Sequence, residues 1–373
     1  MADEYPVPSI WQASVLIRRL RKLPLKRILL AAISVGLIVA TFVYFLPTIA
    51  NYHDVWRVVQ QLSWPWIGAL LAATAINIVT FAPPWQVVLQ GLTFMQAMVV
   101  TQASTALSSV IPGGIAAGVA GSYGMLRSWR FTAGDVTRAV TLTGLWNQFF
   151  NLVFPIVAVF MLTITGEHSA ALATAAFIGV AVLGIIVAGF VLVLLSDRLA
   201  SDIGDVAARF SNWGLAKFRR GPVTWNGASF ERFRDEAGAL LERRWPLLTI
   251  TTLANTLTVY VVLLVSLRAL DVPASQVSAT EAFAAWALVR LIGSVPITPG
   301  GIGIVELGLT GALVGFGGNN AGVVAAVLVY RFLTIVPTIV LGALAALVWR
   351  RQRGTWGEAS LPPEAPGPAT PAP

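Results

Sequence analysis

Three charged side chains, Arg290, Glu306 and Arg331, lie within stretches that are otherwise strongly apolar. An ionisable residue at membrane depth costs roughly 2.5–3.5 kcal/mol, and such residues commonly mark functional sites. Two guanidinium groups and one carboxylate leave a net positive charge, which suits a phosphate headgroup gripped through paired hydrogen bonds. Glu306 is then expected to hold an arginine between substrates, or to accept a proton or an amine headgroup. The structural alternative is a buried Arg290–Glu306 ion pair that fixes the local fold.

A second feature is the phrase Pro-Gly-Gly, which occurs at Pro112 and again at Pro299, 187 residues later. It interrupts a helix because Pro lacks its N–H and Gly is flexible. Backbone breaks at membrane depth are tolerated only under a cover of protein or water, and paired breaks indicate a transport site between related halves. The alternative is two unrelated helix ends, with glycines that serve close helix packing. We predict that Thr298, Pro299, Gly300, Gly301 and Gly303 bind substrate at one break, and that Pro112, Gly113 and Gly114 form the other break.

The elements that position these residues follow from composition. The 373 residues are 56% hydrophobic and 11% charged, whereas soluble domains carry about 25% charged residues. Apolar runs near the 20 residues or so that cross a bilayer recur along the chain. Without cysteine and with two histidines, no metal site or cofactor is expected. The sequence predicts an all-α polytopic membrane protein with six full crossings, at 28–47, 64–82, 139–162, 170–195, 246–267 and 321–349.

The distribution of positive charge predicts the topology. Basic residues gather in the 1–27 segment, the 127–138 loop, the 196–245 segment and the 350–373 tail, and such segments are typically cytoplasmic. Both termini are therefore expected inside, with the basic loops near anionic lipid headgroups rather than nucleic acid. The regions 83–126 and 280–318 must each make an even number of passes, so we predict an inverted pair of re-entrant, broken helical hairpins. Within 196–245, residues 228–244 suit either an amphipathic surface helix or a solvated loop, and the tail is rich in Pro and Ala and predicted to be disordered.

The segment from Pro296 to Glu306, followed by Gly308, Gly311 and the Tyr330-Arg331 pair, resembles the flippase-like membrane family. This family includes the transmembrane region of lysylphosphatidylglycerol synthase, also called multiple peptide resistance factor. The resemblance implies that residues 28–349 form a domain that moves a phospholipid across the bacterial plasma membrane. It also implies a site at Pro299, Gly300, Gly301, Gly303, Glu306, Tyr330 and Arg331. Synthase activity is not expected, because only the 350–373 tail follows the last crossing.

These observations favour a protein that moves a phospholipid or lipid-linked substrate between leaflets. One alternative is an intramembrane transferase that acts on a lipid carrier, although the predicted site offers one carboxylate and no histidine or cysteine. Another is a non-transporting accessory subunit of a lipid-modifying enzyme. A homo-oligomer or such an enzyme partner remains open at this point.

Overall fold

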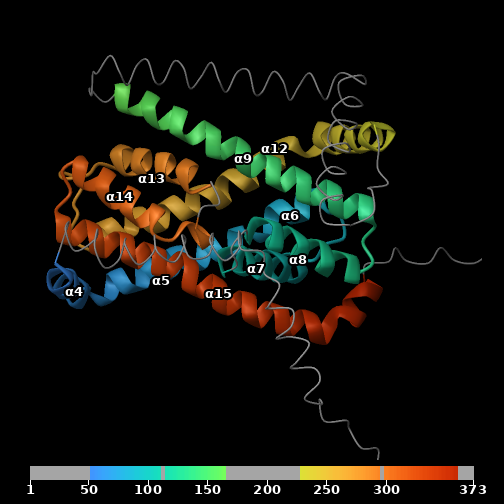
Figure 1. Cartoon of the computed structure of the whole chain (residues 1–373), viewed down its shortest axis with the longest axis horizontal. Helices are drawn as coiled ribbons and strands as arrows, with labels where there is room; N and C mark the ends of the chain where they lie inside the picture. Colours follow the sequence, from blue (N-terminus) through green and yellow to red (C-terminus); the bar gives the residue numbers. More distant parts are fainter. Residues whose placement is uncertain (1–50, 111–113, 165–226, 295–297, 360–373) are drawn as a thin grey trace, which may run out of the picture.

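The computed structural model describes residues 51–110, 114–164, 227–294 and 298–359, and the account below concerns these residues (Figure 1). They form helices joined by short connections, with no β-strand in these ranges. The elements are α4 (Tyr52–Gln60), α5 (Trp64–Thr80), α6 (Ala82–Val88), α7 (Phe94–Val110), α8 (Gly114–Ser128), α9 (Ala133–Ile164), α12 (Gly227–Ala269), α13 (Ala279–Gly293), the short 3₁₀ turn η2 (Pro299–Gly301), α14 (Ile304–Gly315) and α15 (Asn320–Ala359).

Four helical stretches in this part of the chain are long and apolar enough to cross a membrane: Trp64–Val88, Ala133–Ile164, Glu242–Ala269 and Asn320–Gln352. They coincide with the crossings predicted at 64–82, 139–162, 246–267 and 321–349. The crossings predicted at 28–47 and 170–195 lie outside the described residues. The all-helical membrane class is thus confirmed, whereas the total of six crossings stays a prediction.

Two predicted boundaries differ in the structure. The segment 228–244 and the crossing after it form one helix, α12, which runs through Pro246. Proline removes one backbone hydrogen bond. On either side of it, Arg244 donates to the Val87 carbonyl of α6 at 3.4 Å and Thr249 accepts from Trp146 of α9 at 3.0 Å. At the other end of the chain, α15 continues to Ala359, where the sequence predicts a disordered tail. The next proline after Pro337 is Pro362, so nothing in the covalent structure stops the helix earlier.

Two pairs of short helices, α7–α8 and α13–α14, each fold back on themselves as antiparallel hairpins. Small residues let the two legs approach closely. In the first pair, a Cβ at Gly118 would lie 2.8 Å from the Ser104 carbonyl oxygen. In the second pair, a Cβ at Gly308 would lie 3.0 Å from a Val289 methyl group.

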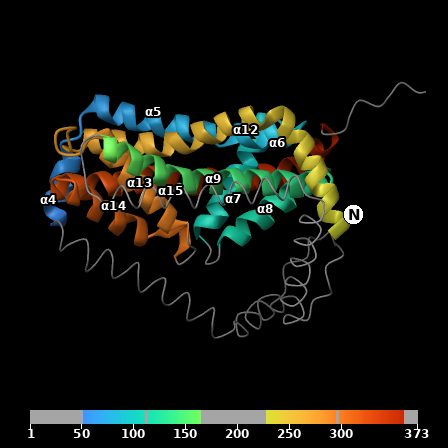
Figure 2. The same ribbon diagram turned by 90° about the horizontal axis from the view of Figure 1, so that it is seen from above.

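The two hairpins open toward opposite ends of the helical bundle (Figure 2). The indole N–H of Trp349, late in α15, donates to the hydroxyl of Ser128 at the end of α8, at 2.8 Å. The backbone N–H of Asn319, just before α15, donates to the side-chain oxygen of Gln276, just before α13, at 3.0 Å. The first hairpin therefore opens beside the end of α15, and the second beside its beginning.

In the described part of the chain, the two ends of the bundle differ in charge. We call the end where α8 and α15 finish the arginine-rich end, which carries Arg127, Arg130, Arg138, Arg243, Arg244, Arg350 and Arg351 with Asp135 and Glu242. The opposite end carries Arg57 and Arg268 with Asp54, Asp271 and Glu281. This asymmetry has the form that the positive-inside rule describes.

The closed tips of the hairpins meet between the two ends (Figure 2). The turn η2 lies against the end of α7, and a Cβ at Gly300 would sit 3.3 Å from the carbonyl oxygen of Ser109. Beside this junction, aromatic rings pack between α9, α12 and α13. The ring centroid of Trp286 lies 5.6 Å from that of Phe154 and 5.7 Å from that of Tyr260. The two breaks thus lie next to each other, beside this cluster of packed aromatic rings.

Candidate functional site

The break in the second hairpin depends on glycine geometry. Gly300, Gly301 and Gly303 have φ of 60°, 67° and 90°, a region in which side chains with a Cβ are strained. Gly300 and Gly301 reverse the chain in the 3₁₀ turn η2, and Gly303 is the N-cap residue of α14. The sequence prediction of a break here is matched by the backbone, because consecutive residues of this conformation cannot belong to an α-helix.

The buried side chain of Glu306 bonds both to a residue of this break and to α15. Its side chain is 2% exposed, and one carboxylate oxygen accepts the backbone N–H of Gly303 at 2.6 Å. The other oxygen accepts Nε of Arg331 at 2.7 Å, while Nη2 of Arg331 donates to the carbonyl of Gly300, also at 2.7 Å. A carboxylate in the first turn is favoured by the helix dipole and satisfies an otherwise unpaired N–H. Glu306 and Arg331 together fasten the tip of the hairpin to α15.

The structural alternative, a buried ion pair between Arg290 and Glu306, is not what the structure shows, because Glu306 pairs with Arg331. Nε of Arg290 instead donates to the side-chain oxygen of Asn151 on α9 at 2.6 Å, and its guanidinium lies 5.4 Å from the Trp286 ring centroid. Arg290 and Glu306 are equally far along the chain from Thr298, which places them at a similar depth, but successive residues are rotated by about 100° around the helix axis. Arg290 therefore projects toward α9, whereas the Glu306 carboxylate turns back to cap its own helix.

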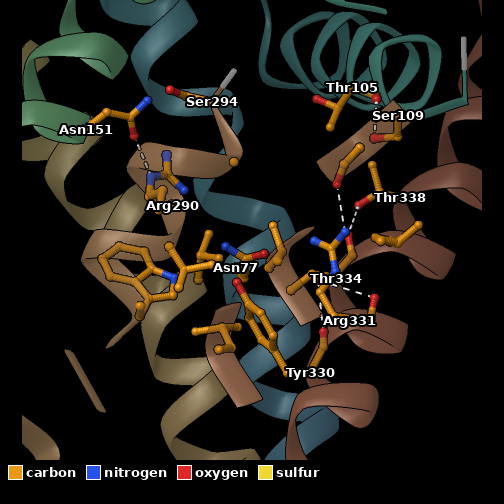
Figure 3. A pocket seen from close by; sticks show the side chains of 18 of the residues that line it. Asn77, Thr105, Ser109, Asn151, Arg290, Ser294, Tyr330, Arg331, Thr334 and Thr338 are labelled. Atoms are coloured by element: carbon orange, nitrogen blue, oxygen red, sulfur yellow. Dashed lines mark hydrogen bonds between the residues drawn. The ribbon is translucent and has the colours of Figure 1, made fainter. Parts of the chain in front are cut away.

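A cavity of about 310 Å³ lies at the junction of the two hairpins. Arg290 on α13 and Arg331 on α15 stand on opposite walls, with Tyr330 between them (Figure 3). Both breaks border the space, through Ser109 of α7 and Gly300 of η2. The remaining polar lining residues are Asn77, Thr105, Asn151, Ser294, Thr334 and Thr338.

The cavity is electropositive. Arg290 and Arg331 are the charged members of its described lining, and Glu306 is not one of the lining residues. Arg331 has Glu306 as its counter-charge. Arg290 makes no ion pair within the described residues, and no bond from its two terminal nitrogens appears there. Because arginine carries donors and no acceptors, these groups offer an anion both charge and hydrogen bonds.

Of the predicted site residues, some line the cavity and others form the turn next to it. Arg290, Gly300, Tyr330 and Arg331 line the cavity, whereas Gly301, Gly303 and Glu306 build the turn behind it. Thr298 is buried, with its hydroxyl unpaired in the described structure, and Pro299 begins the turn η2. Gly114 begins α8, while Pro112 and Gly113 lie outside the described residues.

Sequence reasoning missed several lining residues, notably Asn77, Thr105 and Trp286. Asn77 had a signal, since it is an amide in the middle of a predicted apolar crossing. Thr105 and Trp286 had none, because hydroxyl and aromatic residues occur throughout membrane helices. A second cavity of about 280 Å³ adjoins the first and shares Phe81 and Thr105 with it.

Membrane-length helices around two broken hairpins, with a cationic cavity where the breaks meet, define a polytopic helical membrane protein with a buried polar site. The chain belongs to the family described as the lysylphosphatidylglycerol synthase TM region, whose sequence model matches residues 29–342. The resemblance found in the Pro-Gly-Gly segment and the Tyr330-Arg331 pair is thereby confirmed. Among curated proteins, none matches the chain significantly. The family associates the chain with lipid modification or transport in a membrane.

Proposed function

We propose that this protein translocates a phospholipid or lipid-linked substrate between the leaflets of the bacterial plasma membrane. The observation that carries the proposal is the cavity between the two hairpin breaks, with Arg290 and Arg331 on its opposite walls. An anionic phosphodiester is the lipid group that such a site suits best, because each guanidinium can donate two parallel hydrogen bonds to phosphate oxygens. The acyl chains would stay in the bilayer while the headgroup occupies the cavity.

The hairpins supply the conformational change in this proposal. They open toward opposite ends and meet at Ser109 and Gly300, so they would act as re-entrant gates that enter from opposite sides of the membrane. At this junction beside the cavity, Gly300 lies against the backbone carbonyl of Ser109. Separating the tips on one side at a time would expose the cavity to alternate leaflets, as in transporters built from inverted repeats.

The orientation belongs to the same proposal. The arginine-rich end would face the cytoplasm, where anionic headgroups attract Lys and Arg close to the membrane surface. Both termini would then be cytoplasmic. The sequence holds no phosphate-binding loop that ends in Lys-Ser or Lys-Thr, and we propose that movement is downhill or coupled to an ion.

The test is leaflet exchange of fluorescent phospholipids in liposomes that contain the purified protein. We expect exchange by the wild type and a loss of at least about tenfold in initial rate for Arg290→Gln, because one charge-assisted phosphate contact is removed. Arg290→Lys keeps the positive charge but loses the planar guanidinium, so its exchange rate should lie between those of the wild type and Arg290→Gln. Arg351→Gln removes an exposed arginine at the arginine-rich end and serves as the matched control.

Three results decide the outcome. Wild-type exchange no faster than in empty liposomes, for any anionic headgroup, contradicts the proposal. Equal exchange rates for the wild type and Arg290→Gln contradict the proposal that the headgroup binds in this cavity. Thermal unfolding of each variant shows whether a lost rate reflects a lost site or a lost fold, since Arg290 also holds Asn151.

A further inference from the structure

The second cavity differs chemically from the first. It lies between α7, α8, α9 and α12, beside the α5–α6 bend, and its described lining carries no charged side chain. Aromatic surface comes from Phe81 and Trp85. Eight hydroxyl or amide side chains provide its polar surface: Thr101, Ser104, Thr105, Ser108, Ser122, Thr143, Asn147 and Asn255.

Most of these polar groups present acceptors. The hydroxyls of Thr101, Ser104 and Thr143 donate to carbonyls of their own helices at 3.1, 3.2 and 2.8 Å. Each hydroxyl oxygen therefore keeps its lone pairs for another donor. Asn147 likewise donates to the carbonyl of Thr143 at 3.0 Å, which leaves its side-chain oxygen as an acceptor.

Two further hydroxyls, on Ser108 and Ser122, have no hydrogen-bond partner in the described part of the chain. Ser122 is 3% exposed. Both serines line the cavity, so their hydroxyls are free to bond water or a ligand that enters it. Together with the acceptors, these serines form a neutral wall that fits groups which both donate and accept, such as alcohol hydroxyls.

The two cavities are contiguous and occupy corresponding places in the two hairpins. They share Phe81 and Thr105. Shifting Val305 and Leu309, which line the first cavity, back by the 187-residue spacing of the breaks gives Gly118 and Ser122, which line the second. The same shift turns Arg290 into Ala103. The first cavity thus presents two guanidinium groups to a common space, and the second presents neutral hydroxyls.

We propose that the second cavity binds a neutral, hydroxyl-rich part of the same headgroup whose phosphate lies between Arg290 and Arg331. The substrate class is then a phosphodiester lipid that carries a polyol or sugar, and not one that carries a cationic aminoacyl group. A buried ammonium needs a counter-charge. Neither cavity offers one in its described lining, since Glu306 is engaged by Arg331 behind the wall. This inference rests on the proposed function for the lipid, but it is tested by binding alone.

The test measures binding of four short-chain lipids to the full-length protein in detergent, by isothermal titration. The lipids are phosphatidylglycerol, phosphatidylinositol, lysylphosphatidylglycerol and phosphatidic acid, which share the phosphate and differ in the attached group. We expect the glycerol or inositol lipid to bind at least about fivefold more tightly than phosphatidic acid, a factor that one net hydrogen bond supplies. Lysylphosphatidylglycerol should bind at least about fivefold more weakly than phosphatidylglycerol. Comparing phosphatidylglycerol with phosphatidylinositol shows whether the second cavity prefers a linear or a cyclic polyol.

A double variant, Ser108→Ala with Ser122→Ala, should remove the preference for the polyol lipids and leave phosphatidic acid unchanged within twofold. Thr137→Ala is the matched control, because it deletes a hydroxyl that is exposed on α9 and bonded within its own helix. Tight binding of the lysyl lipid, or an equal loss for all lipids in the double variant, overturns the inference. Equal binding of all four lipids with intact leaflet exchange overturns only the specificity, whereas absence of both overturns the proposed function as well.

Discussion

Replacing Glu306 by Gln tests the most buried charge of the site. The substitution keeps the shape of the side chain, and its amide oxygen can still accept the N–H of Gly303. It removes the negative charge that faces Nε of Arg331 at 2.7 Å. The Arg331 guanidinium is then left with a neutral neighbour at a position where its side chain is 13% exposed. We therefore expect the tip of the second hairpin to loosen from α15.

The size of the effect follows from burial. Removing one partner of a buried ion pair costs about 3–5 kcal/mol, because the remaining charge stays desolvated. Arg331 keeps its bond to the carbonyl of Gly300 and borders the cavity, so the lower limit of about 3 kcal/mol applies. An exposed pair is a useful contrast. Arg57 and Asp54 are 60% and 49% exposed, and Asp54→Asn should cost less than about 1 kcal/mol.

A double-mutant cycle separates the pair from its parts. Glu306→Gln, Arg331→Gln and the combined variant are compared with the wild type by equilibrium unfolding of the purified protein in mixed micelles. We expect the combined variant to be more stable than Glu306→Gln alone, since it holds no uncompensated charge. A cost for Glu306→Gln below about 1 kcal/mol, or strict additivity in the cycle, would refute the view that this pair anchors the break.

Two further predictions address the bundle and its orientation. Gly342→Ala should destabilise the protein by about 1–3 kcal/mol in the same unfolding assay, because its Cβ would overlap Ala106 where α15 crosses α7. Gly311→Ala, in open space on α14, is the control and should be neutral or stabilising by up to about 1 kcal/mol. The chain has no cysteine, so single thiols introduced at Gln61 and Arg351 report the topology. A membrane-impermeant reagent on intact cells should label the first and spare the second, and the reverse pattern would invert the proposed orientation.

The sequence predicts most of the helical framework because membrane helices have a simple signal. Continuous apolar runs predict the described crossings, and Pro-Gly-Gly predicts the break at Gly300. Their boundaries follow less well, since Pro246 does not end α12 and the last helix continues to Ala359. In both cases helix formation continues through residues whose composition suggests a stop.

The contacts of the site were harder to predict than its residues. Arg290, Glu306 and Arg331 were all identified, but the choice of partner depends on rotation about the helix axis, which spacing alone does not give. Glu306 meets an arginine 25 residues away on α15 rather than the one on its own hairpin. The partner of Arg290 is Asn151, on a helix 139 residues distant. Such pairings arise from tertiary packing and leave no mark in the local sequence.

The balance of charge around the cavity indicates where an anionic ligand would bind most favourably. Each buried ionisable group costs roughly 2.5–3.5 kcal/mol before it finds partners. Glu306 and Arg331 offset each other's cost through their ion pair. Arg290 is stabilised by an amide and an aromatic ring, Asn151 and Trp286, and by no opposite charge among the described residues. An anionic headgroup would therefore gain most at Arg290, and the structure leaves this arginine facing the space where the two hairpins meet.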